Sequence, residues 1–222
     1  MHSASARRVV ITGMGVISCI GNTLESFWDN LVHGRSGVTA LRVVDPEKFS
    51  SKIAGQVLDF NPEEFFDPKE ARRMDRFVQF AMAAADRAVA DSRLDMSTED
   101  PARVGVYVGS GIGGLDTIEK QHQRFVARGQ RGISPFFIPM MIVDMAPGLI
   151  SIRHGMKGPN LCVVTACATA AHSIAMAFRG IKFGDADVFV TGGTEAAITD
   201  LGMGGFCSMN ALSTGFNDEP VR

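Results

Sequence analysis

The sequence predicts an α/β protein in which helices cover a mostly parallel β-sheet. Four short β-branched segments, each ending in small residues, have the pattern of strands buried on both faces: residues 7–15, 103–111, 160–168 and 187–195. Helical patterns lie between them, and strands that alternate with helices favour right-handed βαβ units. The 222 residues are 45% hydrophobic and 21% charged, the balance of a globular protein with a proper core.

Two segments carry the clearest helical periodicity. One is residues 70–92, where apolar side chains recur at Met74, Phe77, Val78, Ala81, Met82, Ala85 and Val89. The other is residues 168–184, with Gly184 as the expected C-terminal stop. Its apolar side comprises Ala171, Ile174, Ala175, Phe178 and Ile181. Residues 40–70 are rich in turn residues and predict a surface excursion, whereas 129–148 mixes Gly and Pro with large apolar residues and predicts a loop that buries part of the protein.

Composition excludes several classes of protein. The formal net charge of −2 gives no electrostatic basis for nucleic acid or an anionic membrane as the main partner. No apolar run approaches the roughly 18 residues that span a bilayer, and the start of the chain lacks the apolar region of a secretory signal. The cysteines lack the C-x-x-C spacing of a zinc site: Cys19, Cys162, Cys167 and Cys207. We therefore expect a cytoplasmic protein with no metal and no disulfide framework.

Glycine-rich turns raise the possibility of dinucleotide binding. The turns comprise Gly109, Gly111 and Gly114 after one predicted strand, and Gly13, Gly15 and Ser18 after another. Asp45 ends an apolar run as a ribose-binding acid would, but it lies about 30 residues beyond Gly15, where about 20 is typical. The alternative is that these glycines let backbone pass close to backbone at the ends of strands.

Cys167 lies where a buried strand gives way to a helix. If the strand ends near Val164 and the helix starts near Ala168, the thiol sits at the helix N-terminus. Free backbone N–H groups and the positive end of the helix dipole then favour the thiolate. The same N–H groups can hold an oxyanion during acyl transfer. The alternative is that Cys167 is a small buried hydrophobic residue.

Five segments together carry a resemblance that covers essentially the whole chain. They are VVTACATAAHSIAMAFRGIKFGDADVFVTGGTEA at 163–196, RRVVITGMGVISCIGN at 7–22, GSGIGGL at 109–115, ISPFFIPMMIVDMAPGLISI at 133–152 and LGMGGFCSMNALST at 201–214. In this order they resemble the β-ketoacyl-[acyl-carrier-protein] synthases, the thiolase-like condensing enzymes of fatty acid synthesis. The segment GSGIGGL, with Ile112 at its centre, resembles the corresponding segment of the elongating synthase II type more than that of synthase I.

The resemblance implies a layered αβαβα fold, of which residues 1–222 form the N-terminal thiolase-like domain with a cap region. It implies that Cys167 accepts an acyl chain from acyl-carrier protein as a thioester, with its own backbone N–H as one oxyanion donor. It assigns the acyl tunnel to Ile112, Phe137, Gly202 and Phe206, and the docking of the acidic carrier protein to Lys69, Arg72 and Arg73 at the opening of the long helix. Ordinary core packing and a solvated helix face are the alternatives for these two sets. No cofactor is implied, because the carrier's phosphopantetheine brings the substrates, and a homodimer is expected.

One departure from the family concerns the rest of its chemistry, which needs two histidines and a lysine from a C-terminal half beyond Arg222. His172 is about 140° round the helix from Cys167 and is expected to be a core histidine. The other histidines, His2, His33, His122 and His154, have no evident nucleophile partner. We expect this half to expose an apolar face and to be inactive in condensation when isolated. Two other functions stay open: an NAD(P)-binding oxidoreductase, and a non-catalytic partner subunit similar to the chain-length factors of polyketide systems, against which Cys167 counts.

Overall fold

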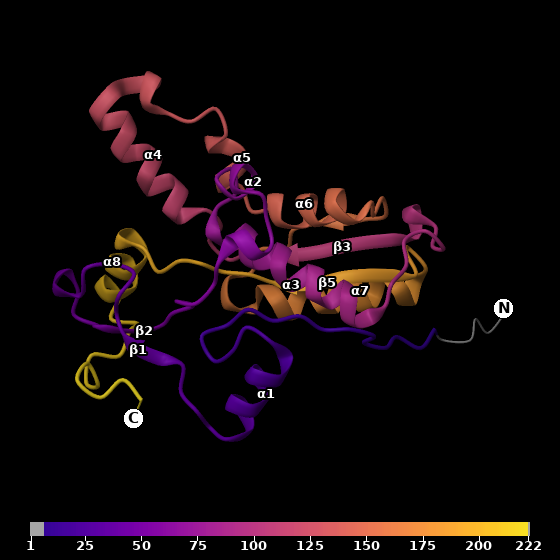
Figure 1. The fold of residues 1–222 in the computed structure, drawn as a ribbon, viewed down its shortest axis with the longest axis horizontal. Coiled ribbons are helices and arrows are strands. Elements are labelled where there is room, and N and C mark those ends of the chain that lie inside the picture. The colour runs from indigo at the N-terminus through magenta and orange to yellow at the C-terminus, as the bar shows by residue number, and fades with distance from the viewer. Residues whose placement is uncertain (1–6, 222) are drawn as a thin grey trace. The chain divides into compact units, whose positions relative to one another are not determined.

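The computed structural model describes residues 7–221 and divides them into two compact units. Unit 1 contains the residues up to Gly15, Phe77–Gly113 and Ile142–Glu195, and unit 2 contains Val16–Arg76, Gly114–Met141 and the residues from Ala196 on. Figure 1 shows the elements of both. Each unit is built from segments that are far apart in the sequence, so each depends on long-range contacts. His2 lies outside the described residues.

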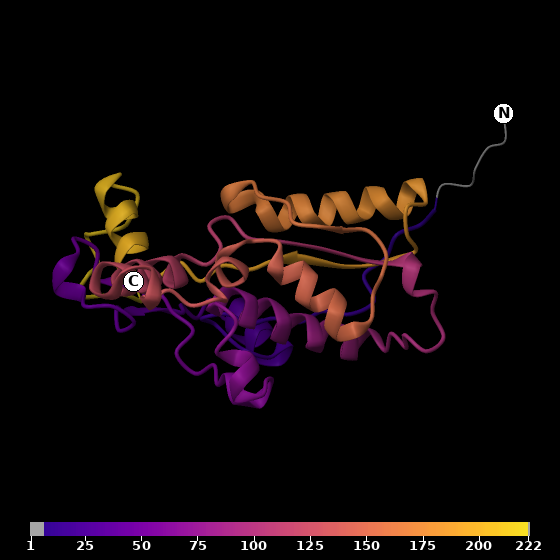
Figure 2. The ribbon, with the colours of Figure 1, turned by 90° about the horizontal axis from the view of Figure 1, so that it is seen from above.

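Unit 1 is a parallel sheet with helices on both faces. Its elements are α3 (Arg76–Ser92), η3 (Pro101–Arg103), β3 (Val104–Gly109), α6 (Met145–His154), β4 (Asn160–Leu161), η5 (Ala166–Ala168), α7 (Thr169–Phe183) and β5 (Val188–Gly193). The strand order is β4-β3-β5, and β3 pairs with β5 from Val104 opposite Val188 to Gly109 opposite Gly193. Helix α7 covers one face of the strands, and α6 and α3 lie on the other (Figure 2). All six residues of β3 are buried, as expected of a central strand covered on both faces.

Two of the four predicted strands, at 103–111 and 187–195, are confirmed, whereas the other two differ. Residues 7–15 form no strand, because no strand among the described residues pairs with them to satisfy their backbone groups. Val10 and Ile11 are instead 61% and 80% exposed. The predicted strand 160–168 is confined to two residues, β4. Beyond Leu161 the backbone no longer pairs with β3. The carbonyl oxygen of Val163 lies so close to Gly109 that a Cβ at Gly109 would collide with it.

Helix α7 packs against the sheet through small side chains. Its buried residues are Thr169, Ser173, Ala177 and Gly180. A Cβ on Gly180 would lie 2.8 Å from the Phe189 ring of β5, so the glycine permits a close approach of helix and strand. The helix ends at Gly184, which adopts the left-handed φ of +86°, as predicted. On its other side Ile174 and Phe178 are about half exposed, at 51% and 47%. This agrees with the expectation of an exposed apolar face.

Unit 2 contains short elements and three longer helices, α1, α4 and α8. The elements are α1 (Leu24–Val32), β1 (Val38–Ala40), η1 (Pro46–Lys48), β2 (Ile53–Gly55), η2 (Pro62–Glu64), α2 (Pro68–Ala71), α4 (Leu115–Arg128), η4 (Gly129–Gly132), α5 (Phe137–Met141) and α8 (Asp200–Ser208). Residues 40–70 are more than a surface excursion, because β1 and β2 form an antiparallel pair. The buried Gln56 donates to Ala40 O and Thr39 Oγ1 beside it. Among residues 7–221, no helix has both the length and the apolar composition that crossing a membrane requires.

The predicted helix at 70–92 is interrupted. Helix α2 ends at Ala71 and α3 begins at Arg76. Between them the buried Asp75 accepts hydrogen bonds from Thr117 N and Thr117 Oγ1, at 2.9 and 2.6 Å. A buried carboxylate needs such donors, so the contact with α4 fixes the chain here in place of a continuous helix. The predicted loop at 129–148 is also partly helical, because it contains η4, α5 and the start of α6.

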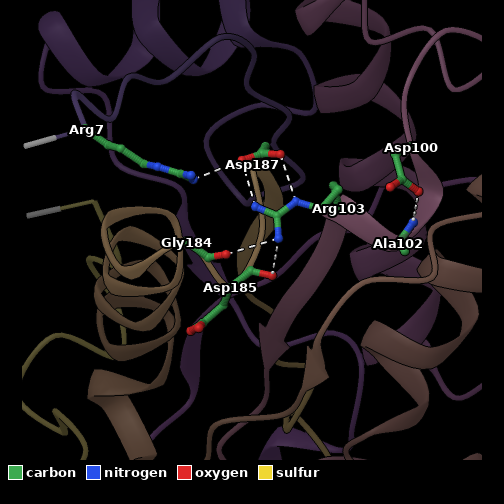
Figure 3. A network of polar contacts seen from close by, with 7 residues as sticks. All are labelled: Arg7, Asp100, Ala102, Arg103, Gly184, Asp185 and Asp187. Atoms are coloured by element: carbon green, nitrogen blue, oxygen red, sulfur yellow. Dashed lines mark hydrogen bonds and ion pairs between the residues drawn. The ribbon is translucent and has the colours of Figure 1, made fainter. Parts of the chain in front are cut away.

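A polar network joins three segments of unit 1 (Figure 3). Arg103, the last residue of η3 and directly before β3, donates to both carboxylate oxygens of Asp187, at 2.8 and 2.9 Å. Its Nη1 also donates to the carbonyl oxygens of Gly184 and Asp185, at 3.0 and 3.2 Å. Arg7 adds a second ion pair to Asp187 at 2.9 Å. One guanidinium thus holds the turn between α7 and β5 against the start of β3.

The network makes stability depend on pH through Asp187. The hydrogen bonds from Arg103, and the charge of Arg7 beside them, hold the pKa of Asp187 below its ordinary value. This contribution is therefore full above the unfolded pKa, about 3.9, and is lost as pH falls through the lower folded pKa. We expect Asp187→Asn to lower the melting temperature of the full-length protein by at most a few degrees at about pH 7, because exposed ion pairs are weak. At about pH 2 the difference should disappear.

Thermal unfolding at the two pH values measures this effect, with Asp218→Asn as the matched control. Asp218 is exposed, and no ion pair of its side chain occurs in the described part of the chain. An equal loss in both variants, or a loss that does not depend on pH, would contradict the assignment.

Candidate functional site

Cys167 lies on a sharp turn directly before α7. It occupies η5, and its side chain is exposed, so it is not the buried hydrophobic residue of the alternative interpretation. The preceding residue, Ala166, has φ +51°, in the left-handed region that residues with a Cβ rarely adopt. Such a residue costs about 1–3 kcal/mol and persists only where the surroundings hold it. The strained turn places the thiol at the beginning of the helix, as the sequence predicts.

The first turn of α7 holds this strained backbone. Thr165 N donates to the side-chain oxygen of the buried Thr169 at 2.9 Å, and Ala168 N donates to Thr165 O at 3.1 Å. The Thr165 hydroxyl and His172 Nδ1 share a hydrogen bond of 2.7 Å. The chain on both sides of Cys167 is therefore tied to residues of α7.

His172 is exposed, so the expectation of a core histidine is wrong. It lies in the first turn of α7, and its Nδ1 shares a hydrogen bond with the Thr165 hydroxyl. Of the other histidines, His154 pairs with Asp86 and His33 with Asp29.

The backbone N–H of Cys167 is a candidate oxyanion donor. In the described part of the chain, no acceptor takes a hydrogen bond from it, whereas the next two N–H groups donate to Thr165 O and Ala166 O. An N–H group without a partner beside an exposed thiol can stabilise the negative oxygen that forms when the thiol attacks a carbonyl. The turn therefore brings together a nucleophile and one oxyanion donor in a single residue.

The glycine-rich loop after β3 is occupied by a carboxylate of this chain. Glu195 Oε2 accepts from the backbone N–H groups of Gly111 and Ile112, at 2.9 and 3.1 Å. These are groups that a bound pyrophosphate would need. The other glycine turn packs on α3, because a Cβ on Gly13 or Gly15 would collide with its backbone. Both turns thus support close backbone packing, and neither supports dinucleotide binding.

Ile112 and Cys167 lie in the same unit and on adjoining segments. A Cβ on Gly111 would lie 3.3 Å from both Cα and O of Ala166, so the loop that carries Ile112 packs directly on the Cys167 turn. Ile112 is 38% exposed there. The neighbouring Cys162 differs from Cys167, because burial raises the pKa of its thiol. The exposed thiol of this segment is therefore Cys167.

Three predicted tunnel residues lie in unit 2. Phe137 begins α5, and Gly202 and Phe206 lie one turn apart in α8. The Thr199 side chain caps α8 by accepting from Gly202 N at 3.1 Å. Gly202 is buried, and a Cβ there would collide with the carbonyl of Ala197, so close backbone packing accounts for this glycine without a substrate.

The three predicted carrier-binding cations are exposed but do not open the long helix. Lys69 lies in α2, and Arg72 and Arg73 lie in the turn that follows it. These residues precede the long helix α3 because the buried Asp75 breaks the helix before Arg76. The Arg73 guanidinium lies 4.5 Å from the centre of the Phe136 ring, a cation–π contact that leaves its charge on the surface.

Sequence reasoning missed the residues that support the turn. Thr165, Thr169 and Glu195 all occur in the quoted segment, but they received no role. The available signal was an acidic residue, Glu195, at the end of a glycine-rich strand. Its partners could not be read from the sequence, because the N–H groups that it binds lie more than 80 positions away. One further thiol has an altered environment: hydrogen bonds from the Ser50 side chain, and then from the Ser51 backbone, lower the pKa of Cys207 in α8. No cluster of three or more potential metal ligands occurs among residues 7–221.

Known proteins with similar sequences place the site in context. Residues 6–221 match a family model described as "Beta-ketoacyl synthase, N-terminal domain". The chain is 50% identical over 218 residues to 3-oxoacyl-[acyl-carrier-protein] synthase 2 of Vibrio harveyi, a match that covers 98% of this chain and 52% of that protein. It is 49% identical over 213 residues to the protein of the same name from Staphylococcus aureus (strain COL), covering 96% and 51%. The chain thus spans about half the length of these curated relatives.

Solved structures agree on the architecture. The ishigamide ketosynthase/chain length factor matches with a TM-score of 0.85 and 28% identity, over 94% of this chain and 52% of that one. The α/β, thiolase-like fold expected from the sequence is thereby confirmed. With the family model matching nearly every residue, the chain belongs to the β-ketoacyl synthase family, whose N-terminal domain it carries.

Proposed function

We propose that the protein containing this chain is a β-ketoacyl-[acyl-carrier-protein] synthase of the synthase II type, an acyltransferase that elongates fatty acyl chains with Cys167 as its nucleophile. The observation that carries the proposal is the exposed Cys167 thiol on the strained Ala166 turn at the start of α7. The relatives named 3-oxoacyl-[acyl-carrier-protein] synthase 2, about 50% identical, support the reaction class.

In the proposed first step, the Cys167 sulfur attacks the thioester carbonyl of an acyl chain on acyl-carrier protein. A C–S bond forms to Cys167, and the bond to the carrier's phosphopantetheine sulfur breaks, which leaves that sulfur to take up a proton. The Cys167 N–H stabilises the oxyanion of the tetrahedral intermediate. The free N–H at this position supports the role.

The second step, decarboxylative condensation with malonyl-carrier protein, is assigned to residues outside this chain. We infer that a C-terminal half supplies them, and that residues 1–222 form the N-terminal domain and do not condense in isolation. The exposed apolar side of α7, with Ile174 and Phe178, is the surface that we assign to contact with that half. A homodimer in the cytoplasm completes the proposal, and the four free cysteines suit a reducing compartment.

The acyl chain is proposed to contact Ile112, whose loop adjoins the Cys167 turn. Phe137, Gly202 and Phe206 keep their proposed contacts with the chain on the family resemblance. For Gly202, local packing is an equally good explanation. No cofactor is proposed, because the carrier brings each substrate. The exposed nucleophile weighs against a non-catalytic partner subunit.

Acylation of Cys167 is the direct test of the proposal. We expect incubation of the full-length protein with acyl-carrier substrate to add one acyl mass to the peptide containing Cys167. The adduct should be lost in Cys167→Ala, with condensation reduced by about a thousandfold or more, because the covalent thioester intermediate can no longer form. Mass spectrometry of the digested protein locates the adduct.

The matched controls are Cys162→Ala, which removes the partly buried thiol of the same segment, and Cys207→Ala, which removes the thiol with the lowered pKa. Both should keep the adduct on Cys167. An adduct that maps to Cys207, or that survives in Cys167→Ala, would refute the assignment.

Carrier docking is proposed at Lys69, Arg72 and Arg73, all exposed. We expect Arg72→Glu to raise KM for acyl-carrier protein by about 2- to 5-fold, because one exposed ion pair contributes up to about 1 kcal/mol. The effect should shrink at high salt. KM for an acyl-pantetheine that lacks the protein should stay unchanged, because it makes no contact with the cations.

The control for this test is Lys157→Glu, which reverses another exposed charge, in unit 1. A similar rise in KM for Lys157→Glu, or a rise for both substrates with Arg72→Glu, would show that the effect is not docking.

The proposed contact of α7 with the C-terminal half predicts that replacing Phe178, which is about half exposed in this chain, lowers the stability of the full-length protein. Phe178→Ser should lower the free energy of unfolding of the full-length protein by about 1.5–3 kcal/mol, the range for a fully buried large side chain. Urea unfolding measures it. Ile152→Ser on α6, across the strands, is the control, because Ile152 is 76% exposed. A change within about 0.5 kcal/mol for Phe178→Ser would contradict the contact.

A further inference from the structure

Glu195 holds the loop that follows β3 with both of its carboxylate oxygens. Oε2 accepts from Gly111 N and Ile112 N at 2.9 and 3.1 Å, and Oε1 accepts from Ser110 Oγ at 3.1 Å. The same Ser110 oxygen accepts from Gly113 N at 3.0 Å. Every residue from 110 to 113 is thus bonded to Glu195 directly or through Ser110. One carboxylate and one hydroxyl therefore define the backbone of this loop.

The anchor is itself rigidly placed. Thr194, the preceding residue, donates from its backbone N to Gly109 O at 3.0 Å and from its hydroxyl to Phe77 O at 2.7 Å. These bonds attach the end of β5 to the end of β3 and to the first buried turn of α3. Ser110 is fully buried, so its hydroxyl has a fixed environment. Glu195 consequently extends from a fixed point to the loop.

The loop in turn packs on the nucleophile. Gly111 lies between the Glu195 carboxylate and the Ala166 backbone, since a Cβ on it would be 2.9 Å from Glu195 Oε2 and 3.3 Å from Ala166 Cα. Ile112 is the next residue, and its own N–H is one of the groups that Glu195 binds. A shift of this loop therefore moves the Ile112 side chain relative to the Cys167 turn.

We propose that Glu195 is a positioning residue for acyl-chain specificity: it fixes residues 110–113, and with them Ile112, against the turn that carries Cys167. The inference rests on the proposed function, because Ile112 selects among acyl chains only if Cys167 carries one. Glu195 acts through the loop and does not contact the reacting atoms. Its removal leaves the N–H groups of Gly111 and Ile112 without their acceptor, so the loop relaxes and the space beside Ile112 changes.

The test compares acyl chains in the full-length protein. Glu195→Ala should change the ratio of kcat/KM for a long and a short saturated acyl-carrier substrate by roughly 3- to 10-fold, because differential contact with the chain is altered. Glu195→Gln should stay within about twofold of the parent, since its amide oxygen accepts from the same N–H groups and its NH2 reaches Ser110 Oγ. Ser110→Ala removes part of the network and should change the ratio in the same direction by less.

The matched control is Asp100→Ala. Asp100 accepts a backbone hydrogen bond from Ala102 N at 2.9 Å, just before β3 begins, so the same kind of bond is lost at the opposite end of the strand. Its ratio should equal that of the parent. Amide hydrogen exchange of residues 110–113 should be at least tenfold faster in Glu195→Ala than in Asp100→Ala.

The outcomes separate the two proposals. A changed ratio in Glu195→Ala, with rescue by Glu195→Gln, supports the positioning role. An unchanged ratio overturns it, and so does unchanged exchange at residues 110–113, even where Cys167 is acylated normally. If Glu195→Ala does not fold, Ser110→Ala decides by the same two measurements. Absence of Cys167 acylation in the parent protein overturns the proposed function, and the specificity role with it, whatever the exchange shows.

Discussion

The close packing of α7 on strands β3 and β5 is the constraint on which the rest of unit 1 depends. Small residues, including Ala177 and Gly180, let the helix approach the strands, so its first turn lies at the carboxyl ends of the parallel sheet. Functional residues of open α/β sheets gather at this edge. Three strands end there, and they are followed by Ile112 after β3, Cys167 after β4 and Glu195 after β5.

The same packing supports a strained backbone at the nucleophile. Ala166 is held in a left-handed conformation that an isolated peptide would avoid, and the hydrogen bond from Thr165 N to Thr169 Oγ1 joins it to the helix. The strain has a structural result, because it turns the chain sharply enough to leave the Cys167 thiol exposed while Thr169 is buried two residues later.

Internal charge explains why the glycine-rich loop does not form a nucleotide site. Adjacent backbone N–H groups attract an anion, and here the anion is the Glu195 carboxylate of the same chain. The loop is therefore ordered without a ligand, and its glycines serve close packing against Ala166 and Val163. The glycine-rich motif can therefore occur without a nucleotide, because the same backbone N–H groups bind any well-placed oxygen anion.

The sequence by itself determined the α/β class, the strands at 103–111 and 187–195, the helix that ends at Gly184, the family, and the place of Cys167 at a helix start. The family follows from the resemblance of the quoted segments to known sequences. The other features follow from local patterns: runs of β-branched residues, helical periodicity, and small residues at the ends of elements. Only the tertiary structure decided the break at Asp75, the non-strand backbone of 7–15, the exposed His172 and the anchoring role of Glu195. Each depends on groups distant in the sequence or on the face that a helix turns to the sheet. Asp75 accepts from Thr117, and Glu195 accepts from the N–H groups of Gly111 and Ile112. Among the described residues no strand pairs with 7–15, and the orientation of α7 leaves His172 exposed. A local pattern specifies an element, but long-range contacts decide where it stops and what its side chains meet.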